Sequence, residues 1–398
     1  MQSAYAPARL AGVDLARGVA VLGMFAVHVG PDPVGGISRV LEVFHGRAAA
    51  LFLFLAGVSL SLMSGGPVGL DGPARRRSRI RIAVRAAVLL VLGLALTSLD
   101  TSIDVILQCY AAVFLLMLPL LRLRARSLAV LAAVFAIAGP VLSFTIRRAA
   151  GWNADSTPSA PGLANLNSWH GVGQGALSVL LNGAYPVLTI MAFTLAGMAV
   201  GRLDLSAMTV RVRLILTGTA LLATGYAGSA VLMSAFNLFE KIGGGSAVAG
   251  ERLVHSSEVA ERGTVPTSSW AWLFTAGPHS GTPMEVLGAT GCALVVVGAA
   301  LLVTDHTPRA LVPLTALGMM GLTAYTGHLV AVWLISDDGD LPTGWITLAV
   351  FTVTTLVFAV VWLRLFRRGP LESLLRTASH AVARRFSPGV PVTECKDP

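Results

Sequence analysis

The chain has 398 residues, of which 55% are hydrophobic and only 12% carry a charge, and its mean hydropathy is +0.74. This composition excludes an ordinary soluble domain and is typical of a protein that crosses a membrane several times. The formal net charge is +9. The basic residues form short clusters beside apolar segments, without interleaved aromatic residues that would stack on bases, so the charge does not indicate a nucleic-acid partner.

Ten apolar segments are long enough to cross the hydrocarbon core of a bilayer as helices. In chain order they cover residues 11–29, 47–64, 81–98, 103–121, 127–146, 177–200, 212–234, 286–304, 310–335 and 343–365. We therefore predict an all-α polytopic membrane protein, with one transmembrane helical domain over residues 1–368 and a basic tail over 369–398. Within the tail, the pattern from Pro370 to Phe386 predicts an amphipathic helix at the membrane interface. The first segment carries charges and lacks a small-residue cleavage site, so it is not expected to be a cleaved signal peptide.

The basic residues also predict the orientation. If the N-terminus is cytoplasmic, most of them fall on the cytoplasmic side, including the run from Arg75 to Arg85 and the clusters near Arg122 and Arg211. The positive-inside rule then places both termini in the cytoplasm. Arginine is strongly preferred to lysine, and alanine, glycine, valine and leucine are abundant. That usage is typical of a GC-rich bacterial genome, so we expect a multi-pass protein of a bacterial plasma membrane, in the cell envelope.

Three polar residues lie in the first apolar segment. Arg17 and His28 are spaced to fall on one face of a helix, about 16 Å apart along its axis, and Asp14 lies one turn before Arg17. A charged group inside a bilayer costs about 2.5 to 3.5 kcal/mol on insertion scales unless it faces protein or water. The stripe therefore predicts a functional polar channel. The alternative is that Asp14 and Arg17 are anchors at the start of the helix and that His28 is a hydrated residue at its end.

Further polar side chains are predicted to converge on the outer half of the bilayer. They come from several segments and comprise His28, His45, Arg47, Asp104, Gln108, Tyr185, Tyr325 and His328, with His279 in an outer loop. Asp14 and Arg17 are left on the inner half, which predicts a site that is reached from both faces. Cys109 and Cys292 lie in predicted spans and Cys395 in the tail, and their spacing indicates neither a disulfide framework nor a metal site.

Several blocks of the sequence resemble known families. Asp14, Arg17 and His28 together resemble the first-helix motif of the acyltransferase-3 family. The blocks VDLARGVAVLGM, HGRAAALFLFLAGVSLSL, GAYPVLTIMAFTLAGMAVGRL, PHSGTPMEVLG, LGMMGLTAYTGHLV and FRRGPLESLLR resemble the YeiB-like family, which is related to the catalytic domain of heparan-alpha-glucosaminide N-acetyltransferase. These blocks run from the first helix to the tail. The resemblance implies a transmembrane acyltransferase that moves an acyl group from cytoplasmic acyl-CoA to an extracytoplasmic sugar, glycolipid or similar acceptor.

The resemblance also implies roles for individual residues. The heparan enzyme has asparagine at the position of His28, and its active histidine lies in the outer segment before the second helix, where this chain has His45. We favour His28 as the catalytic base because its register with Arg17 agrees with helix geometry, and we keep His45 as the second choice. Arg17, oriented by Asp14, is expected to attract the donor, with Arg47, Gln108 and Tyr110 as further donor contacts. Acceptor contacts are expected from Tyr185, His279, Tyr325 and His328.

Other interpretations stay open. The same polar stripe would serve a proton-coupled transporter or exporter of a small polar or lipid-like solute. The run from Arg75 to Arg85 either holds the nucleotide of CoA or only sets topology and contacts anionic lipid. The expected partners are the lipid bilayer, an acyl-CoA donor, with acetyl-CoA favoured, and a glycan or lipid acceptor. No metal is expected, and a homodimer is left open.

Overall fold

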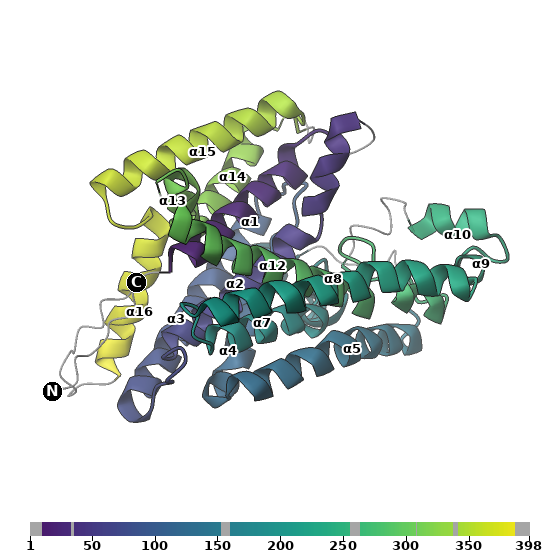
Figure 1. Ribbon diagram of the computed structural model, residues 1–398, viewed down its shortest axis with the longest axis horizontal. Coiled ribbons are helices and arrows are strands. Elements are labelled where there is room, and N and C mark those ends of the chain that lie inside the picture. The colour runs from purple at the N-terminus through teal and green to yellow at the C-terminus, as the bar shows by residue number, and fades with distance from the viewer. Residues whose placement is uncertain are drawn as a thin grey trace.

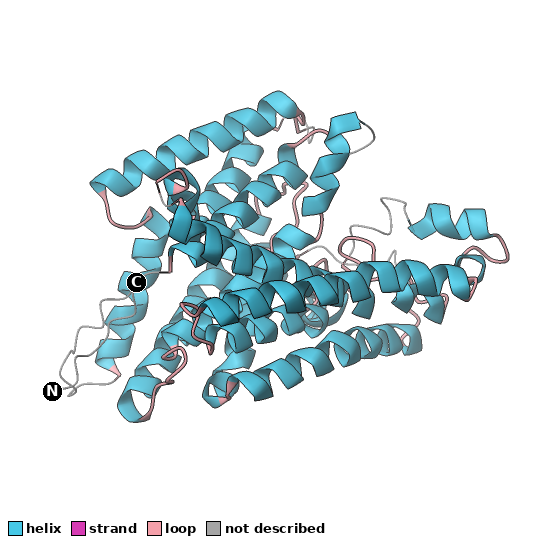
Figure 2. Ribbon diagram, in the orientation of Figure 1, coloured by secondary structure: helices cyan, strands magenta, loops and turns pink. Residues whose placement is uncertain are grey.

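The structure is a computed structural model that describes residues 10–32, 36–152, 160–254, 263–307, 309–336 and 341–386. Within these ranges the chain forms helices joined by loops and turns, with no strand (Figure 2). The all-α polytopic architecture expected from the sequence is therefore confirmed. Cys395 and the end of the predicted tail, residues 387–398, lie outside the described ranges.

Seven helices of the described chain are long and apolar enough to cross a membrane. They are α1 (Ala11–Val29), α2 (Arg47–Met63) together with the 3-10 helix η1 (Gly36–Phe44) before it, α3 (Gly72–Thr97), α5 (Ala125–Ala149), α8 (Met208–Ala235), α12 (Pro283–His306) and α15 (Trp345–Leu365). Each of these coincides with a segment predicted from the sequence. Hydrophobic segment length was thus sufficient to find them.

Two predicted spans, 177–200 and 310–335, are wrong as single straight helices. The first is built from α6 (Trp169–Leu177) with the π-helical turn η5 (Ser178–Asn182), and from α7 (Val187–Gly201), at an angle of 57°. The second is α13 (Val312–Met319) followed by α14 (Gly321–Ile335), at 82°. Pro186, which lacks a backbone N–H, precedes α7. If each bent pair counts as one span, the described chain has up to nine.

The predicted span 103–121 is also shorter than expected. Its α-helix, α4 (Leu107–Met117), begins four residues later and continues as the 3-10 helix η2 (Leu118–Arg122). Pro119 stands near the start of η2, where the α-helix ends. This segment is apolar but too short to pass as a long membrane helix by itself.

The helix α1 lies inside the bundle and α15 lies at its edge (Figure 1). In the most apolar stretch of α1, 72% of the residues are buried, against 11% in α15. The α1 helix packs against α2, α12 and α13. Polar groups on α1 are therefore placed among neighbouring helices, whereas α15 exposes its apolar side chains.

The bundle has two distinct ends (Figure 1). At one end α16 (Pro370–Arg385), which is the helix predicted for the tail, packs on α3 and α14. We call this the α16 end, and α3, α5 and α8 begin there. At the opposite end lie α9 (Leu238–Ile242) and α10 (Ala247–Val254). The short 3-10 helix η6 (Trp270–Phe274) packs on α9 and α8.

Candidate functional site

The first polar group of the site is an ion pair on α1. Asp14 is 7% exposed, and its Oδ1 accepts a hydrogen bond of 2.8 Å from Nη1 of Arg17, one turn later. Arg17 also donates to Oγ of Ser59 on α2 and to the carbonyl of Gly318 on α13, both at 3.2 Å. The guanidinium is therefore held by contacts with α1, α2 and α13.

The carbonyl of Gly318 is available because α13 ends at the following residue. The last carbonyls of a helix have no partner within it, and they attract a cation. Gly18 on α1 and Gly318 allow this approach, since a Cβ at Gly318 would lie 1.7 Å from the carbonyl oxygen of Asp14 and one at Gly18 would lie 2.1 Å from that of Leu314. The two helices thus touch backbone to backbone beside Arg17.

The start of α14 is held by an acidic residue of the tail helix. Oε1 of Glu372 on α16 accepts hydrogen bonds from the backbone N–H of Leu322 at 2.8 Å and of Thr323 at 3.1 Å. Its Oε2 accepts from the Thr323 hydroxyl at 2.6 Å. A carboxylate at a helix N-terminus satisfies unpaired N–H groups and complements the helix dipole. Arg17 and Glu372 therefore stabilise the two sides of the same break.

A pair of histidines lies further along α1. Nδ1 of His28 is 3.0 Å from Nε2 of His328 on α14, and the two rings are stacked with centroids 5.2 Å apart. His28 is half-buried, whereas His328 is 3% exposed. The rings of Phe25 and Tyr325 each lie 5.3 Å from that of His328 and fix its position. The sequence predicts that His28 and His328 lie in the same, outer half of the bilayer. It does not predict the hydrogen bond between them.

Two further histidines lie near this pair, which makes a cluster of four. His45 and His279 lie close enough to His28 for their charges to interact, and His45 also interacts with His279. Nδ1 of His45 is 3.3 Å from the carbonyl of Leu41. Loss of solvation, and secondarily the charge of His45, lowers the pKa of His279 to about 4. In the described ranges, no group of three or more histidine, cysteine or acidic residues could hold a metal ion.

A small cavity adjoins the histidine cluster. It has a volume of about 30 Å³, and its lining includes Tyr185, Thr189, His279 and Glu285. The rings of Tyr185 and His279 meet edge to face with centroids 5.5 Å apart. A space of this size and polarity is large enough for one or two water molecules. The predicted acceptor residues Tyr185 and His279 are thus neighbours.

Sequence reasoning missed Glu285, which is 6% exposed in this cavity. It stands three residues after Thr282, whose hydroxyl accepts a hydrogen bond of 3.2 Å from the backbone N–H of Glu285. The pattern Thr-x-x-Glu before an apolar run is a capping box, and it was the available signal in the sequence. The pattern predicts the start of α12. It does not predict that the carboxylate lies in a cavity beside His279.

Three residues expected to contact the donor have different surroundings. Arg47 donates to the hydroxyl of Tyr226 at 2.9 Å and lies over its ring, so it holds α2 against α8. Gln108 donates through Nε2 to the Thr97 hydroxyl at 2.7 Å and to the carbonyl of Pro161 at 2.9 Å. Both amide hydrogens of Gln108 are therefore used within the protein, which leaves it without a donor for a substrate carbonyl.

The third of these residues, Tyr110, is only 9% exposed, and its hydroxyl has no hydrogen-bond partner in the described part of the chain. It lies within electrostatic range of Arg17, Tyr185 and Tyr325. By contrast, the Tyr325 hydroxyl accepts from the backbone N–H of Ile106 at 3.2 Å. A buried hydroxyl without a partner is uncommon in proteins and calls for an explanation.

Comparisons with known proteins divide the chain into two parts. The family model described as heparan-alpha-glucosaminide N-acetyltransferase, catalytic, matches residues 9–227, which include Asp14, Arg17, His28 and His45. A second family model, described as a protein of unknown function (DUF418), matches residues 263–381, which include His279 and His328. No curated protein matches the chain. The bond between His28 and His328 therefore joins one matched region to the other.

Proposed function

Because the chain belongs to the heparan-alpha-glucosaminide N-acetyltransferase catalytic family, we propose that it transfers an acetyl or related acyl group from cytoplasmic acyl-CoA to an extracytoplasmic sugar, glycolipid or similar acceptor. The observation that carries the proposal is the hydrogen bond between His28 and His328 at one end of the buried helix that holds Arg17 and Asp14. One continuous helix thus offers an anion-binding group and a proton acceptor at different depths. Acyl transfer across a membrane needs both.

The reaction replaces one acyl bond by another. The hydroxyl or amine of the acceptor attacks the thioester carbonyl, the carbon–sulfur bond breaks, and the proton of the acceptor ends on the CoA thiol. A neutral sugar hydroxyl or protonated amine is a poor nucleophile, so a base at the attacking atom accelerates the step. Imidazole, with an ordinary pKa near 6.5, suits both removal of that proton and its return to the leaving sulfur.

In the proposed mechanism His28 is the base and His328 positions it. The ring of His328 also interacts with the backbone of Ala324 and Tyr325, and its second nitrogen, Nδ1, has no hydrogen bond of normal geometry in the described chain. A proton on Nδ1 leaves Nε2 of His328 as the acceptor. Nδ1 of His28 then donates, so that Nε2 of His28 keeps the lone pair that takes the proton. His45 is the second candidate for this role.

Arg17 is the proposed contact for the donor. Its guanidinium has five N–H groups, and three hydrogen bonds to Asp14, Ser59 and Gly318 account for three of them. The others are available for an acyl or pantetheine carbonyl. Tyr110 is proposed to donate its hydroxyl proton to the thioester oxygen as negative charge develops there, because it lies near Arg17 and has no competing acceptor in the described chain.

The proposed direction of transfer follows from the positive-inside rule. The arginines from Arg75 to Arg85 lie in the first half of α3, which begins at the α16 end. That end would face the cytoplasm and admit acyl-CoA, and the α9–α10 end would face the acceptor.

The first experiment uses purified protein in nanodiscs with radiolabelled acetyl-CoA. We expect Arg17→Ala to weaken binding, and His28→Ala to slow thioester loss by about 10²- to 10⁴-fold while binding is retained. His45→Ala tests the second candidate. His170→Ala, at an exposed histidine outside the cluster, is the matched control and should behave as wild type. Wild-type protein that neither binds nor consumes acetyl-CoA or a longer acyl-CoA would contradict the proposal.

A proton-coupled transporter is the second candidate function, and the break between α13 and α14 favours it. Discontinuous helices whose ends face polar groups are common at transporter binding sites. The distinction is chemical, since a transporter moves an unaltered solute and an acyltransferase consumes its donor. Solute uptake by proteoliposomes that lack acyl-CoA would favour transport.

A further inference from the structure

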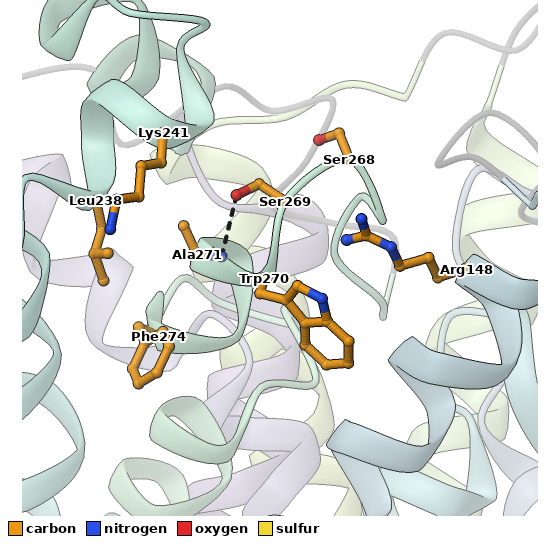
Figure 3. A pocket seen from close by; sticks show the side chains of 8 residues that line it. All are labelled: Arg148, Leu238, Lys241, Ser268, Ser269, Trp270, Ala271 and Phe274. Atoms are coloured by element: carbon orange, nitrogen blue, oxygen red, sulfur yellow. Dashed lines mark hydrogen bonds between the residues drawn. The ribbon is translucent and has the colours of Figure 1, made fainter.

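A pocket outside the histidine cluster lies at the α9–α10 end, between the end of α5, α9 and η6 (Figure 3). Its volume is about 330 Å³. Ligand pockets in proteins have volumes of about 300 to 1,000 Å³, so this one is large enough for a headgroup or a single sugar but not for a long chain. None of the residues that sequence analysis proposed for the site lines it.

Among the described residues, the two charged side chains that line the pocket are both basic. Figure 3 shows Arg148, from the end of α5, on one side and Lys241, from α9, on the other, with Trp270 between them. The guanidinium of Arg148 lies 5.6 Å from the ring centroid of Trp270. No carboxylate from the described residues lines the pocket. Two cations without an acidic neighbour in the lining favour an anionic ligand.

The two serines of the pocket can also donate hydrogen bonds to a ligand. The Ser268 hydroxyl oxygen accepts from Nε1 of Trp272 at 3.1 Å, and that of Ser269 accepts from the backbone N–H of Ala271 at 3.3 Å. Each hydroxyl is used as an acceptor in these bonds and still has its own proton to donate. Arginine, lysine and two hydroxyls form a set of donors typical of phosphate recognition.

The rest of the lining is apolar. Leu238, Phe274 and the ring of Trp270 face the pocket, and Trp270 is held by Phe144 with ring centroids 4.6 Å apart. Trp270 and Phe274 are 45% and 38% exposed. Tryptophan with neighbouring apolar side chains at the end of membrane helices is typical of the interface between lipid tails and headgroups. The pocket therefore fits a ligand that combines an anion with an apolar portion or a sugar ring.

We propose that this pocket binds a phosphate group joined to a lipid or a sugar, as in the headgroup of an anionic phospholipid or glycolipid or in a free sugar phosphate. The binding itself does not rest on the acyl-transfer function. The loop that lines the pocket continues to His279 of the histidine cluster. The hydrogen bond from the Thr282 hydroxyl to the carbonyl of Thr275 holds the two ends of this part of the loop together. If the proposed function is correct, the pocket would bind the phosphate of the acceptor.

The test is native mass spectrometry of detergent-purified protein with two phosphate probes, phosphatidylglycerol and glucose 1-phosphate. Diacylglycerol and glucose are the uncharged controls. We expect the variant with Arg148→Gln and Lys241→Gln together to bind the phosphate probe about tenfold or more weakly, because two charged hydrogen bonds are lost. Arg252→Gln, at an exposed position of α10, is the matched control and should bind as wild type.

The outcomes separate the two sources of phosphate. If the double variant weakens binding of phosphatidylglycerol but wild type does not bind glucose 1-phosphate, the pocket recognises a lipid headgroup. If the double variant weakens binding of both probes equally, the pocket recognises the phosphate itself. Binding of neither probe, or binding that the double variant leaves unchanged, would overturn the inference. Both substituted side chains are exposed, so an unfolding temperature near that of wild type verifies folding.

Acetyl-CoA hydrolysis, measured without acceptor in the same double variant, keeps the two proposals apart. It should equal that of wild type, because neither side chain lies in the proposed catalytic site. Wild-type protein that binds the phosphate probes but not acyl-CoA would end the acyl-transfer proposal and leave the pocket assigned. Wild-type protein that binds acyl-CoA but neither phosphate probe would end the pocket proposal and leave the acyl-transfer proposal standing.

Discussion

His28 and His328 are 300 residues apart in the chain, yet Nδ1 of one lies 3.0 Å from Nε2 of the other. A hydrogen bond between two imidazoles requires one nitrogen to donate and the other to accept, so the pair carries at most one positive charge while the bond persists. Because His28 belongs to α1 and His328 to the bent pair of helices, the bond links the buried centre of the bundle to its discontinuous element.

Replacement of His328 by phenylalanine should slow acyl transfer without removing the base. The ring is kept, but the acceptor for Nδ1 of His28 is lost, and we expect initial rates to fall by about 10- to 100-fold. His28→Ala should cost about 10²- to 10⁴-fold, the range typical of a lost general base. The double variant should be no slower than His28→Ala, because the two residues act as a unit. Losses that multiply would contradict that relationship.

Tyr110→Phe separates a catalytic from a structural role. The buried hydroxyl has no hydrogen-bond partner in the described chain, so its removal should leave the unfolding temperature unchanged or slightly raised. The transfer rate should nevertheless fall about 10²- to 10³-fold if the hydroxyl stabilises the thioester oxygen. Gln108→Leu is the informative comparison. It leaves the Pro161 carbonyl without its donor and should lower stability by about 1 to 3 kcal/mol.

Much of the fold could be predicted because the membrane requires long apolar helices. The spans α1, α2, α3, α5, α8, α12 and α15 follow directly from hydropathy. The break between α13 and α14 could not be predicted, since its stability comes from distant residues. The bend after Met319 is stabilised by Arg17, about 300 residues earlier, and by Glu372 on α16. Neither contact leaves a signal in the local sequence.

The candidate site was predictable in its composition but not in its contacts. Helix periodicity placed Asp14 and Arg17 together, and the structure contains that ion pair. In the sequence, His28 and His45 are alternative bases at separate positions. In the structure, the two histidines belong to one cluster. Gln108 is a candidate because of its residue type and its depth in the fourth segment, and neither property shows whether its amide is already bonded.

Glu372→Gln should weaken the attachment of α16 to the bend. The carboxylate accepts from two backbone N–H groups at the start of α14, and loss of a helix-capping interaction costs about 0.5 to 2 kcal/mol. We expect a lower unfolding temperature, measured by differential scanning fluorimetry in detergent. Glu251→Gln, at an exposed position of α10, should have no effect. Equal behaviour of the two variants would mean that the cap contributes nothing to stability.

Gly318→Ala should separate α1 from α13. The new Cβ would lie 1.7 Å from the Asp14 carbonyl oxygen, so the two backbones must move apart beside Arg17. We expect reduced stability and weaker acetyl-CoA binding, read from fluorimetry and equilibrium binding. Gly327→Ala is a matched control on α14, because no atom of the described residues lies within 4 Å of its added Cβ and alanine favours a helix by about 0.5 to 1 kcal/mol. It should be neutral or stabilising.

The stability of the protein should depend on pH through His279. Its pKa in the folded protein is about 4, whereas an unfolded chain has a histidine pKa near 6.5. Between these values the unfolded state binds more protons, so the contribution of His279 to the free energy of unfolding rises as pH increases from 4 to 6.5 and is constant outside that window. Unfolding temperatures between pH 4 and 7.5 should therefore fall toward the acidic end.

His279→Asn should remove that part of the pH dependence. Asparagine tolerates the left-handed backbone at this position, where φ is 53°, so the substitution changes the titration with little added strain. We expect the difference in unfolding temperature between variant and wild type to shift in favour of the variant as pH falls through the window. His170→Asn, at an exposed histidine, should follow wild type throughout. Parallel curves for His279→Asn and wild type would show that the His279 ring is solvated in the folded protein, because a solvated imidazole would titrate alike in both states.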